Sequence, residues 1–381
     1  MKKILSAIAF SASLAASFAA LAAQPPVLIV GLAELSGNGA TPGTNFNNGI
    51  KMAVNEINAS GGILGRQIDY QAFDTQTNPS IAKSLAQKAI DSGAYVVMGP
   101  VYSGSTIVSM TETRRAEVTN FTGAEAPSIT QQGNPYIFRT CLSLGAMFPK
   151  LAKYVKDTVK AKTVTILHGN NETGIGARDA ARKSLEAQGV KVVSVISTEP
   201  GQVDFTAAVL AAKRSDSDAL VVYVNEEESA HLLRALRQQG FTKPVIGATT
   251  LTSPSVLKMA GDAGTNATAV VDLAYGAPQP AFKAYNQKFE AAYHYKSDSN
   301  AMKGYSAMYI IKAVTEKLQK FDTKALAAML HGIKLSAAQY PGILLDVAYD
   351  DKGDMDRETF LVQAKDGQQV VTGTLPAAFA K

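Results

Sequence analysis

Residues 94–106 read AYVVMGPVYSGST, and this stretch predicts a buried strand that passes through a polar turn into a helix. The apolar run Ala94 to Met98 ends at Gly99-Pro100, and small hydroxyl and glycine residues follow before a helical pattern begins. Ser103 to Thr106 would lie at a helix N-terminus, where free backbone N–H groups and the helix dipole favour an anion. A serine or threonine that only caps the helix is the common alternative. No lysine follows the glycine as in a Walker motif, which disfavours a nucleotide phosphate.

The same order of strand, polar turn and helix recurs along the whole chain. The first series predicts strands at 27–32, 68–73, 95–98 and 118–121, a loop at 36–43, and helices at 47–58, 81–92 and up to residue 115. The second predicts helices at 148–159, 176–188, 204–213 and 229–239, with strands at 163–168, 190–196, 219–224 and 245–246. Such alternation indicates an α/β fold with parallel sheets covered by helices on both faces, in two lobes that meet near residues 139–143.

The last hundred residues break this rhythm. A strand at 269–275 resembles a return crossing between the lobes, and helices are expected at 281–293 and 304–318. Apolar runs at 344–349 and 360–364, separated by Asp350-Asp351-Lys352-Gly353, predict a last crossing and a hairpin.

The first residues predict export from the cytoplasm. A basic start, Met1-Lys2-Lys3, precedes an apolar run, and small residues allow cleavage after Ala22 or Ala23, so that 1–23 would be a signal peptide. A membrane anchor is disfavoured, because no second charged flank follows the apolar run. The single cysteine, Cys141, excludes an intramolecular disulfide, and the cleavage region has no cysteine that could carry a lipid. We therefore expect a soluble protein of the bacterial periplasm.

Composition and motifs argue against nucleic-acid binding and against catalysis. The chain has 381 residues and a formal charge of +5, which falls to about +3 when Lys2 and Lys3 are removed. The four histidines are far apart and lack metal-ligand spacing, and no base stands near Cys141. The glycines at 37, 39 and 43 do not have the spacing of a dinucleotide fingerprint. We expect no enzyme activity, cofactor or metal; a cation-binding role for Glu226, at the start of a helix, stays open.

Three stretches together resemble one family. GIKMAVNEINASGGILGRQIDYQAFDTQTNP (49–79), VVMGPVYSGST (96–106) and TGAEAPSITQQGNPYIFRT (122–140) are similar to the branched-chain amino-acid-binding periplasmic proteins of ABC transporters. The resemblance implies the type I periplasmic binding fold: two Rossmann-like lobes, joined by three crossings near residues 139–143, 271–275 and 345–350, which close on a ligand. One lobe would hold 24–142 with 276–349, and the other 143–275 with 350–381.

The resemblance also suggests where the ligand binds. In that family a serine of the strand–turn block and the next turn hold the ligand carboxylate, at positions that correspond to Ser103 and to 123–125 here. Glu125 stands where the family often has a hydroxyl residue, and Thr249 or Thr250 replaces the acid that usually pairs with the ligand ammonium. The full candidate set is Tyr102, Ser103, Gly104, Gly123, Glu125, Thr173, Asn225, Glu226 and Thr249.

These departures leave two ligand classes open. Burying an ammonium without a carboxylate is costly, so either Glu125 or Glu226 supplies the charge for an amino acid, or the ligand has no ammonium. In the second case a small carboxylate or amide fits, or an aromatic acid that stacks on Tyr102. The expected role is the monomeric substrate-binding component of an ABC importer that binds a small amino acid, branched-chain or related, with an inner-membrane permease as its partner. A sensor that presents its ligand to a chemoreceptor or kinase is the alternative role.

Overall fold

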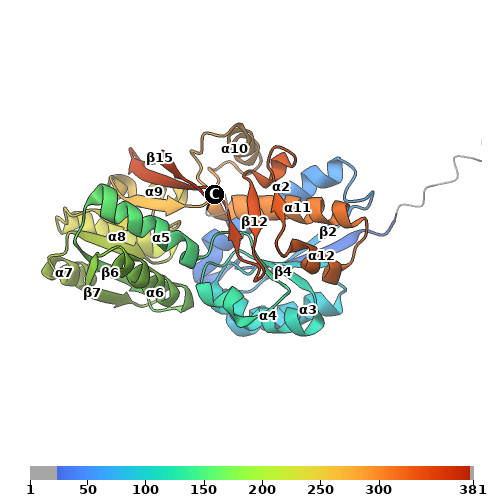
Figure 1. Ribbon diagram of the computed structural model, residues 1–381, viewed down its shortest axis with the longest axis horizontal. Coiled ribbons are helices and arrows are strands. Elements are labelled where there is room, and N and C mark those ends of the chain that lie inside the picture. Colours follow the sequence, from blue (N-terminus) through green and yellow to red (C-terminus); the bar gives the residue numbers. More distant parts are fainter. Residues whose placement is uncertain (1–23, 378–381) are drawn as a thin grey trace, which may run out of the picture.

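The computed structural model describes residues 24–377, which fold into two α/β lobes side by side (Figure 1). The predicted signal peptide at 1–23 lies outside the described residues. Within residues 24–377, no helix is both long and apolar enough to cross a membrane.

The first lobe is built on a five-stranded parallel sheet in the order β2-β1-β3-β4-β5. Helices α2 and α11 pack together over one face, while α3 and α4 pack together on the other (Figure 1). Its strands are β1 (Val27–Ala33), β2 (Ile68–Asp74), β3 (Val96–Met98), β4 (Thr119–Thr122) and β5 (Ile137–Arg139). Its helices are α2 (Ala40–Ala59), α3 (Pro79–Asp91), α4 (Ser103–Ala116), α10 (Pro280–Tyr293), α11 (Ser299–Leu318) and α12 (Thr323–Leu330).

The second lobe has a seven-stranded sheet in the order β15-β14-β10-β9-β8-β6-β7. The five strands β10, β9, β8, β6 and β7 are parallel, and the hairpin β14–β15 adds two antiparallel strands beside β10. The strands are β6 (Thr163–Gly169), β7 (Lys191–Thr198), β8 (Ala219–Tyr223), β9 (Val245–Gly247), β10 (Thr268–Val271), β14 (Thr359–Lys365) and β15 (Gln368–Leu375). The helices are α5 (Leu144–Tyr154), α6 (Glu172–Ala187), α7 (Thr206–Arg214), α8 (Glu226–Gln238) and α9 (Pro254–Ala260).

Several helices begin earlier than the sequence pattern predicts, and the differences are largest for α2 and α11. Helix α2 begins at Ala40, after a short 3-10 turn at Gly37–Gly39, so most of the expected loop at 36–43 is helical. Pro42 is tolerated there because the first helical turn has no intrahelical N–H partner to lose. Helix α11 begins at Ser299 rather than at residue 304, because the Asp298 side chain accepts a hydrogen bond from the Ala301 N–H and caps it.

A small third sheet changes the expected route between the lobes. Strand β12 (Val347–Tyr349) pairs with β11 (Lys334–Leu335) and with β13 (Met355–Asp356) in antiparallel fashion. The third crossing of the chain between the lobes, here called a passage, therefore lies at Arg357 and Glu358, between β13 and β14, and not at residues 345–350. The first two passages follow β5 and β10. The remaining short helices are η3 (Pro127–Gln132), the π-helical turn η4 (Val155–Val159), η5 (Gly261–Gly264) and η6 (Pro341–Ile343).

A buried ion pair joins the three passages. Asp272, just after β10, accepts hydrogen bonds from Arg357 Nη2 at 2.7 Å and from the Leu142 N–H at 3.2 Å. The same Arg357 nitrogen donates to the Thr140 carbonyl. Both side chains of the pair are almost fully buried, and the Arg357 charge opposes burial so that the pKa of Asp272 stays below its ordinary value. One residue from each passage thus contributes to a single polar contact.

Candidate functional site

A cavity of about 40 Å³ lies between the lobes, where the carboxyl ends of the parallel strands face one another. Turns that follow β1, β3, β4, β6, β8 and β9 all supply lining residues, and the first turn of α11 supplies the rest. Ligands of open α/β sheets bind at this end of the strands. The position therefore identifies the cavity as the candidate binding site.

Two larger cavities are lined by other residues. One of about 540 Å³ opens near the start of β9 and β10, at the opposite end of the second sheet. Another, of about 1220 Å³, is a surface groove between α5, α6 and the small sheet. The second includes Pro127, Ser128 and Glu172, which follow β4 and β6, but neither shares a lining residue with the cavity of about 40 Å³.

Six of the nine predicted site residues line the cavity between the lobes: Tyr102, Gly123, Glu125, Thr173, Asn225 and Glu226. Ser103 lies directly behind this lining. Gly104 and Thr249 do not line the cavity: the Thr249 hydroxyl contacts the Met147 sulfur, and its neighbour Thr250 is the residue that reaches the cavity. Six further residues line the cavity: Thr250, which was the predicted alternative to Thr249, and the unpredicted Pro42, Val101, Tyr223, Asn300 and Lys303.

Ser103 connects the two lobes instead of capping its helix. The N-cap of α4 is Tyr102, which makes no side-chain capping hydrogen bond within the described chain, and Ser103 is the first helical residue. The Ser103 hydroxyl oxygen accepts hydrogen bonds from the Ala126 N–H at 3.2 Å and from the Thr173 hydroxyl at 2.8 Å. Thr173 belongs to α6 of the second lobe. The hydroxyl is thus committed to the interlobe contact.

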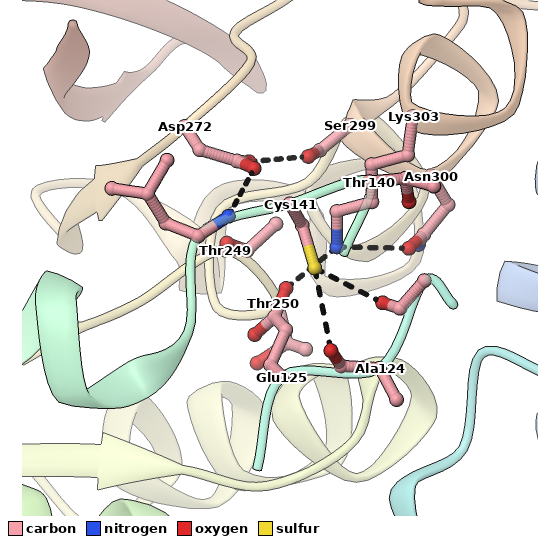
Figure 2. Close-up of polar contacts among 12 residues, drawn as sticks. Ala124, Glu125, Thr140, Cys141, Thr249, Thr250, Asp272, Ser299, Asn300 and Lys303 are labelled. Atoms are coloured by element: carbon pink, nitrogen blue, oxygen red, sulfur yellow. Dashed lines mark hydrogen bonds and ion pairs between the residues drawn. The ribbon is translucent and has the colours of Figure 1, made fainter. Parts of the chain in front are cut away.

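Glu125 is held by one partner from each lobe. Its carboxylate accepts a hydrogen bond from Lys303 Nζ at 2.6 Å and another from the Tyr223 hydroxyl at 2.7 Å. Burial by itself would lower the pKa of Lys303, but the Glu125 charge raises it above the ordinary value, so the pair is ionic. Figure 2 shows Lys303 and Asn300 extending from the same helix toward Glu125. The carboxylate predicted to repel an anionic ligand is therefore neutralised within the protein.

Glu226 is the acid that faces the cavity without a cationic hydrogen-bond partner among the described contacts. It begins α8, is 6% exposed, and accepts a hydrogen bond from the Asn300 side chain at 3.2 Å. Burial and the nearby charge of Asp298 raise the pKa of Glu226 to about 7. Burial also raises the pKa of Asp298, which caps α11. Two neighbouring buried carboxyls whose pKa values are both raised form a site that a positive group would stabilise.

The remaining lining residues are fixed by caps and by one more buried acid. The Asn225 side chain takes part in a capping box with Glu228 at the start of α8. Tyr102 and Val101 donate their backbone N–H groups to the Glu34 carboxylate, whose pKa burial raises to about 7. These contacts fix the turns around the cavity before any ligand is bound.

Cys141 supports the site from behind. The thiol is buried and lies within hydrogen-bonding distance of the Gly123 and Ala124 carbonyl oxygens (Figure 2). Burial raises its pKa to about 12, so the sulfur stays protonated and has no nucleophilic character at neutral pH. This agrees with the expectation of a structural thiol.

The missed residues come from places that sequence patterns describe poorly. Lys303 and Asn300 were missed because α11 was expected to begin at residue 304; the Asp298-Ser299 pair was the capping signal that marks the true start. Tyr223 ends an otherwise aliphatic strand, so it looked like a core residue. Its hydroxyl partner comes from the other lobe, which no local pattern reveals.

Two α/β lobes with a buried polar cavity at the facing strand ends define the class of two-lobed binding proteins that hold a small ligand in the interlobe cleft. The chain belongs to the periplasmic binding protein family, whose sequence profile matches residues 26–369. The family and its relatives are substrate-binding proteins, not enzymes, as the sequence predicted.

Characterised relatives cover nearly the whole chain. One is the leucine-, isoleucine-, valine-, threonine- and alanine-binding protein of Pseudomonas aeruginosa, 27% identical over 93% of this chain and 94% of its own. Another is the Leu/Ile/Val-binding protein BraC3 of Rhizobium johnstonii, 29% identical over 95% of this chain and 98% of its own. The resemblance to branched-chain amino-acid-binding proteins is thus confirmed.

Solved structures confirm the fold. A leucine-binding protein from Thermotoga maritima superposes with a TM-score of 0.83 at 19% identity, covering 92% of this chain and 99% of its own. A solute-binding protein of an ABC transporter from R. palustris, in complex with benzoate, gives 0.83 at 22% identity over 93% and 97%. The two neighbours differ in the ligands their descriptions name, so the shared fold leaves the ligand of this chain to be argued from its own residues.

Proposed function

We propose that this protein is the substrate-binding component of an ABC importer and that its ligand is a small amino acid. The ligand ammonium binds at Glu226, and Asp298 adds negative charge from behind the cavity lining. The ligand carboxylate lies at the start of α4, near Ser103, Thr173 and the Gly123 turn.

One observation carries this proposal: Glu226 is a buried acid that lines the cavity while the cation of the site, Lys303, is already hydrogen-bonded to Glu125. Asn300, which donates to Glu226, belongs to the first turn of α11, as does the neighbouring cap Asp298. Without a ligand, ionising Glu226 is opposed by burial and by Asp298. A ligand ammonium removes this penalty, because a buried carboxylate is stabilised by an opposite charge at contact distance.

The carboxylate end of the ligand is supported by different groups. The α4 N-terminus presents backbone N–H groups and the positive end of the helix dipole. Because no side chain of the N-cap Tyr102 engages them, these groups are suited to an anion. The amino-acid specificity of the Pseudomonas aeruginosa relative supports the same ligand class.

The remaining parts of the proposal concern the cell. We propose that residues 1–23 are removed on export, that the mature protein is a periplasmic monomer, and that it delivers its ligand to an inner-membrane permease. We propose the lobe boundaries 24–142 with 276–349 and 143–275 with 350–381, except that the last boundary moves to the passage at Arg357 and Glu358. Ligand uptake with the cognate permease distinguishes transport from presentation to a chemoreceptor or kinase.

A thermal-shift screen of the unfolded, refolded and therefore ligand-free protein tests the ligand class. The panel pairs each amino acid with its ammonium-free analogue, such as alanine with lactate, and includes amides and benzoate. A ligand at about 100 times its dissociation constant adds about 2.7 kcal/mol to the free energy of unfolding. We expect alanine to stabilise the protein and lactate to have little effect. Stabilisation by lactate or benzoate alone would show that the ligand lacks an ammonium.

A further inference from the structure

The ligand site is already filled by side chains where a larger ligand would extend. Its cavity of about 40 Å³ is smaller than an amino acid needs, so a ligand enters while the cleft is open. The lining side chains that cannot move on closure then set how far the ligand extends. The lining on one side consists of Lys303, Glu125 and Tyr223, whose polar ends meet at the Glu125 carboxylate.

We propose that the Lys303–Glu125 pair sets the upper limit on ligand size, so that the protein selects amino acids with side chains of one or two heavy atoms and excludes leucine. This inference rests on the proposed amino-acid function and adds the determinant of specificity. The pair acts as a plug inside the site: it occupies the volume that the side chain of a larger ligand would need.

On the Lys303 side, the plug cannot move outward because α11 is fixed against α2. A side chain at Gly49 of α2 would come within 1.8 Å of the Ala301 carbonyl oxygen. One at Gly304 of α11 would come within 2.3 Å of the Phe46 carbonyl oxygen. The two helix backbones therefore touch directly beside Lys303, whose side chain is 1% exposed. This backbone contact opposes an outward shift of the α11 turn that carries Lys303.

On the Glu125 side, the turn is fixed by a buried arginine. Arg139 donates one nitrogen to the Ala124 carbonyl and another to the Ala126 carbonyl, each at 2.8 Å. Glu125 lies between these two residues, and its second carboxylate oxygen is taken by Tyr223. The carboxylate is thus held by its own backbone and by a residue of the opposite lobe.

Displacing the plug would separate a buried ion pair. A ligand side chain that entered the space would have to turn Lys303 away from Glu125 and leave two charges without partners in a dry site. The free energy lost by separating the Lys303–Glu125 pair would exceed the free energy gained by burying a leucine side chain. Selection against larger ligands therefore follows from charge as well as from volume.

Calorimetric titration with two matched pairs of ligands tests the limit. The first pair is alanine with leucine, and the second is lactate with 2-hydroxyisocaproate. The members of each pair differ by the same side chain, and the ligands of the second pair lack the ammonium. We expect the smaller member of whichever pair binds to bind at least about tenfold more tightly. Equal or tighter binding of the larger member would overturn the size limit, whereas binding of the hydroxy acids alone would overturn only the amino-acid function. If no small member of either pair binds, both proposals fail.

Two double variants separate volume from charge. Glu125→Ala with Lys303→Ala empties the space, and we expect the ratio of alanine to leucine affinity to fall at least about tenfold. Glu125→Gln with Lys303→Met removes the charges but keeps the volume, and should retain a preference for alanine. An unchanged ratio in the alanine variant would contradict the assignment. If that variant fails to fold, the ratio measured for the wild-type protein still decides the size limit.

Discussion

At the scale of single residues, Glu226 and Ser103 carry the two ends of the proposed ligand. The two side chains differ in how far groups of the protein itself already satisfy them. The Ser103 hydroxyl oxygen accepts one hydrogen bond from Thr173 across the cleft and one from the Ala126 N–H of its own lobe, whereas Glu226 is a carboxyl whose burial raises its pKa to about 7. The first therefore positions a ligand, and the second changes its charge when a ligand arrives.

The affinity for alanine should depend on pH through Glu226. In the ligand-free protein the acid is largely protonated below pH 7, and a bound ammonium requires it ionised, so binding releases a proton. The groups that face it are Asp298, Lys303 and Asn300 on α11. We expect the affinity to rise by up to about tenfold per pH unit between pH 5 and 7, then level off. Calorimetry across this range checks it, and an affinity that falls as the pH rises would contradict the ion pair.

Replacing Ser103 by alanine should weaken ligand binding by roughly 1–3 kcal/mol. The change removes the hydroxyl that accepts from Thr173 across the cleft and leaves the Ala126 N–H without this partner. Ser109→Ala is the matched control, because that buried hydroxyl donates to the Thr106 carbonyl within the same helix and does not line the cavity. Equal affinities in both variants would show that Ser103 serves only the fold.

At the scale of elements, the close contact between α2 and α11 fixes the first turn of α11, which supplies Asn300 and Lys303 to the cavity. Two glycines make the contact possible, Gly49 on α2 and Gly304 on α11. A side chain at either position would require the backbones to separate, since the nearest atoms are backbone oxygens rather than flexible side chains.

Gly49→Ala should lower the free energy of unfolding by about 1–3 kcal/mol and weaken ligand binding together with it. The extra carbon would push α11 outward and displace Lys303 from Glu125. Gly145→Ala, in the first turn of α5, is the control, because an added carbon there meets neighbours at an ordinary distance of 3.5 Å. Thermal unfolding compares the two variants; a loss in the control as large as in Gly49→Ala would show that close packing is not the cause.

Much at this scale was predictable from local patterns, and the failures have a common physical origin. The strand–turn–helix rhythm predicted both parallel sheets, because buried strands and amphipathic helices leave clear periodicities. Helix α2 was placed seven residues too late because Pro42 and Gly43 look like a loop, yet fit a first turn that packs tightly on the Glu34 backbone. Tyr223 and Lys303 were missed because their role depends on Glu125, a partner about a hundred or more residues away.

At the scale of the whole molecule, the lobes are joined at the passages and in the cleft. The passages share the Asp272–Arg357 pair, while direct hydrogen bonds across the cleft join Ser103 to Thr173 and Glu125 to Tyr223. The structure is thus a closed form, in which contacts between side chains add to those that a ligand would make. We expect ligand binding to shift an equilibrium between open and closed forms, as in other hinged binding proteins.

Asp272→Asn should destabilise the protein by about 3–5 kcal/mol, because it leaves the buried Arg357 charge without its partner. The effect should shrink at acidic pH, since the wild-type carboxylate stabilises the fold only while it is ionised, and its pKa lies below the ordinary value. Asp216→Asn removes an exposed ion pair with Lys243 and should change the stability by less than about 0.5 kcal/mol. Chemical denaturation at neutral pH distinguishes these values, and similar stabilities would contradict a structural role for the pair.

The proposed function as a whole depends on whether Glu226 binds an ammonium. The most direct measurement is the calorimetric affinity for alanine, at pH 8, of the wild-type protein and of Glu226→Gln. We expect at least about 30-fold weaker binding in the variant, because a buried charge pair is lost, and no loss for ammonium-free ligands. Unchanged alanine affinity would contradict the Glu226–ammonium pair and place the ammonium, or the ligand itself, elsewhere in the cleft.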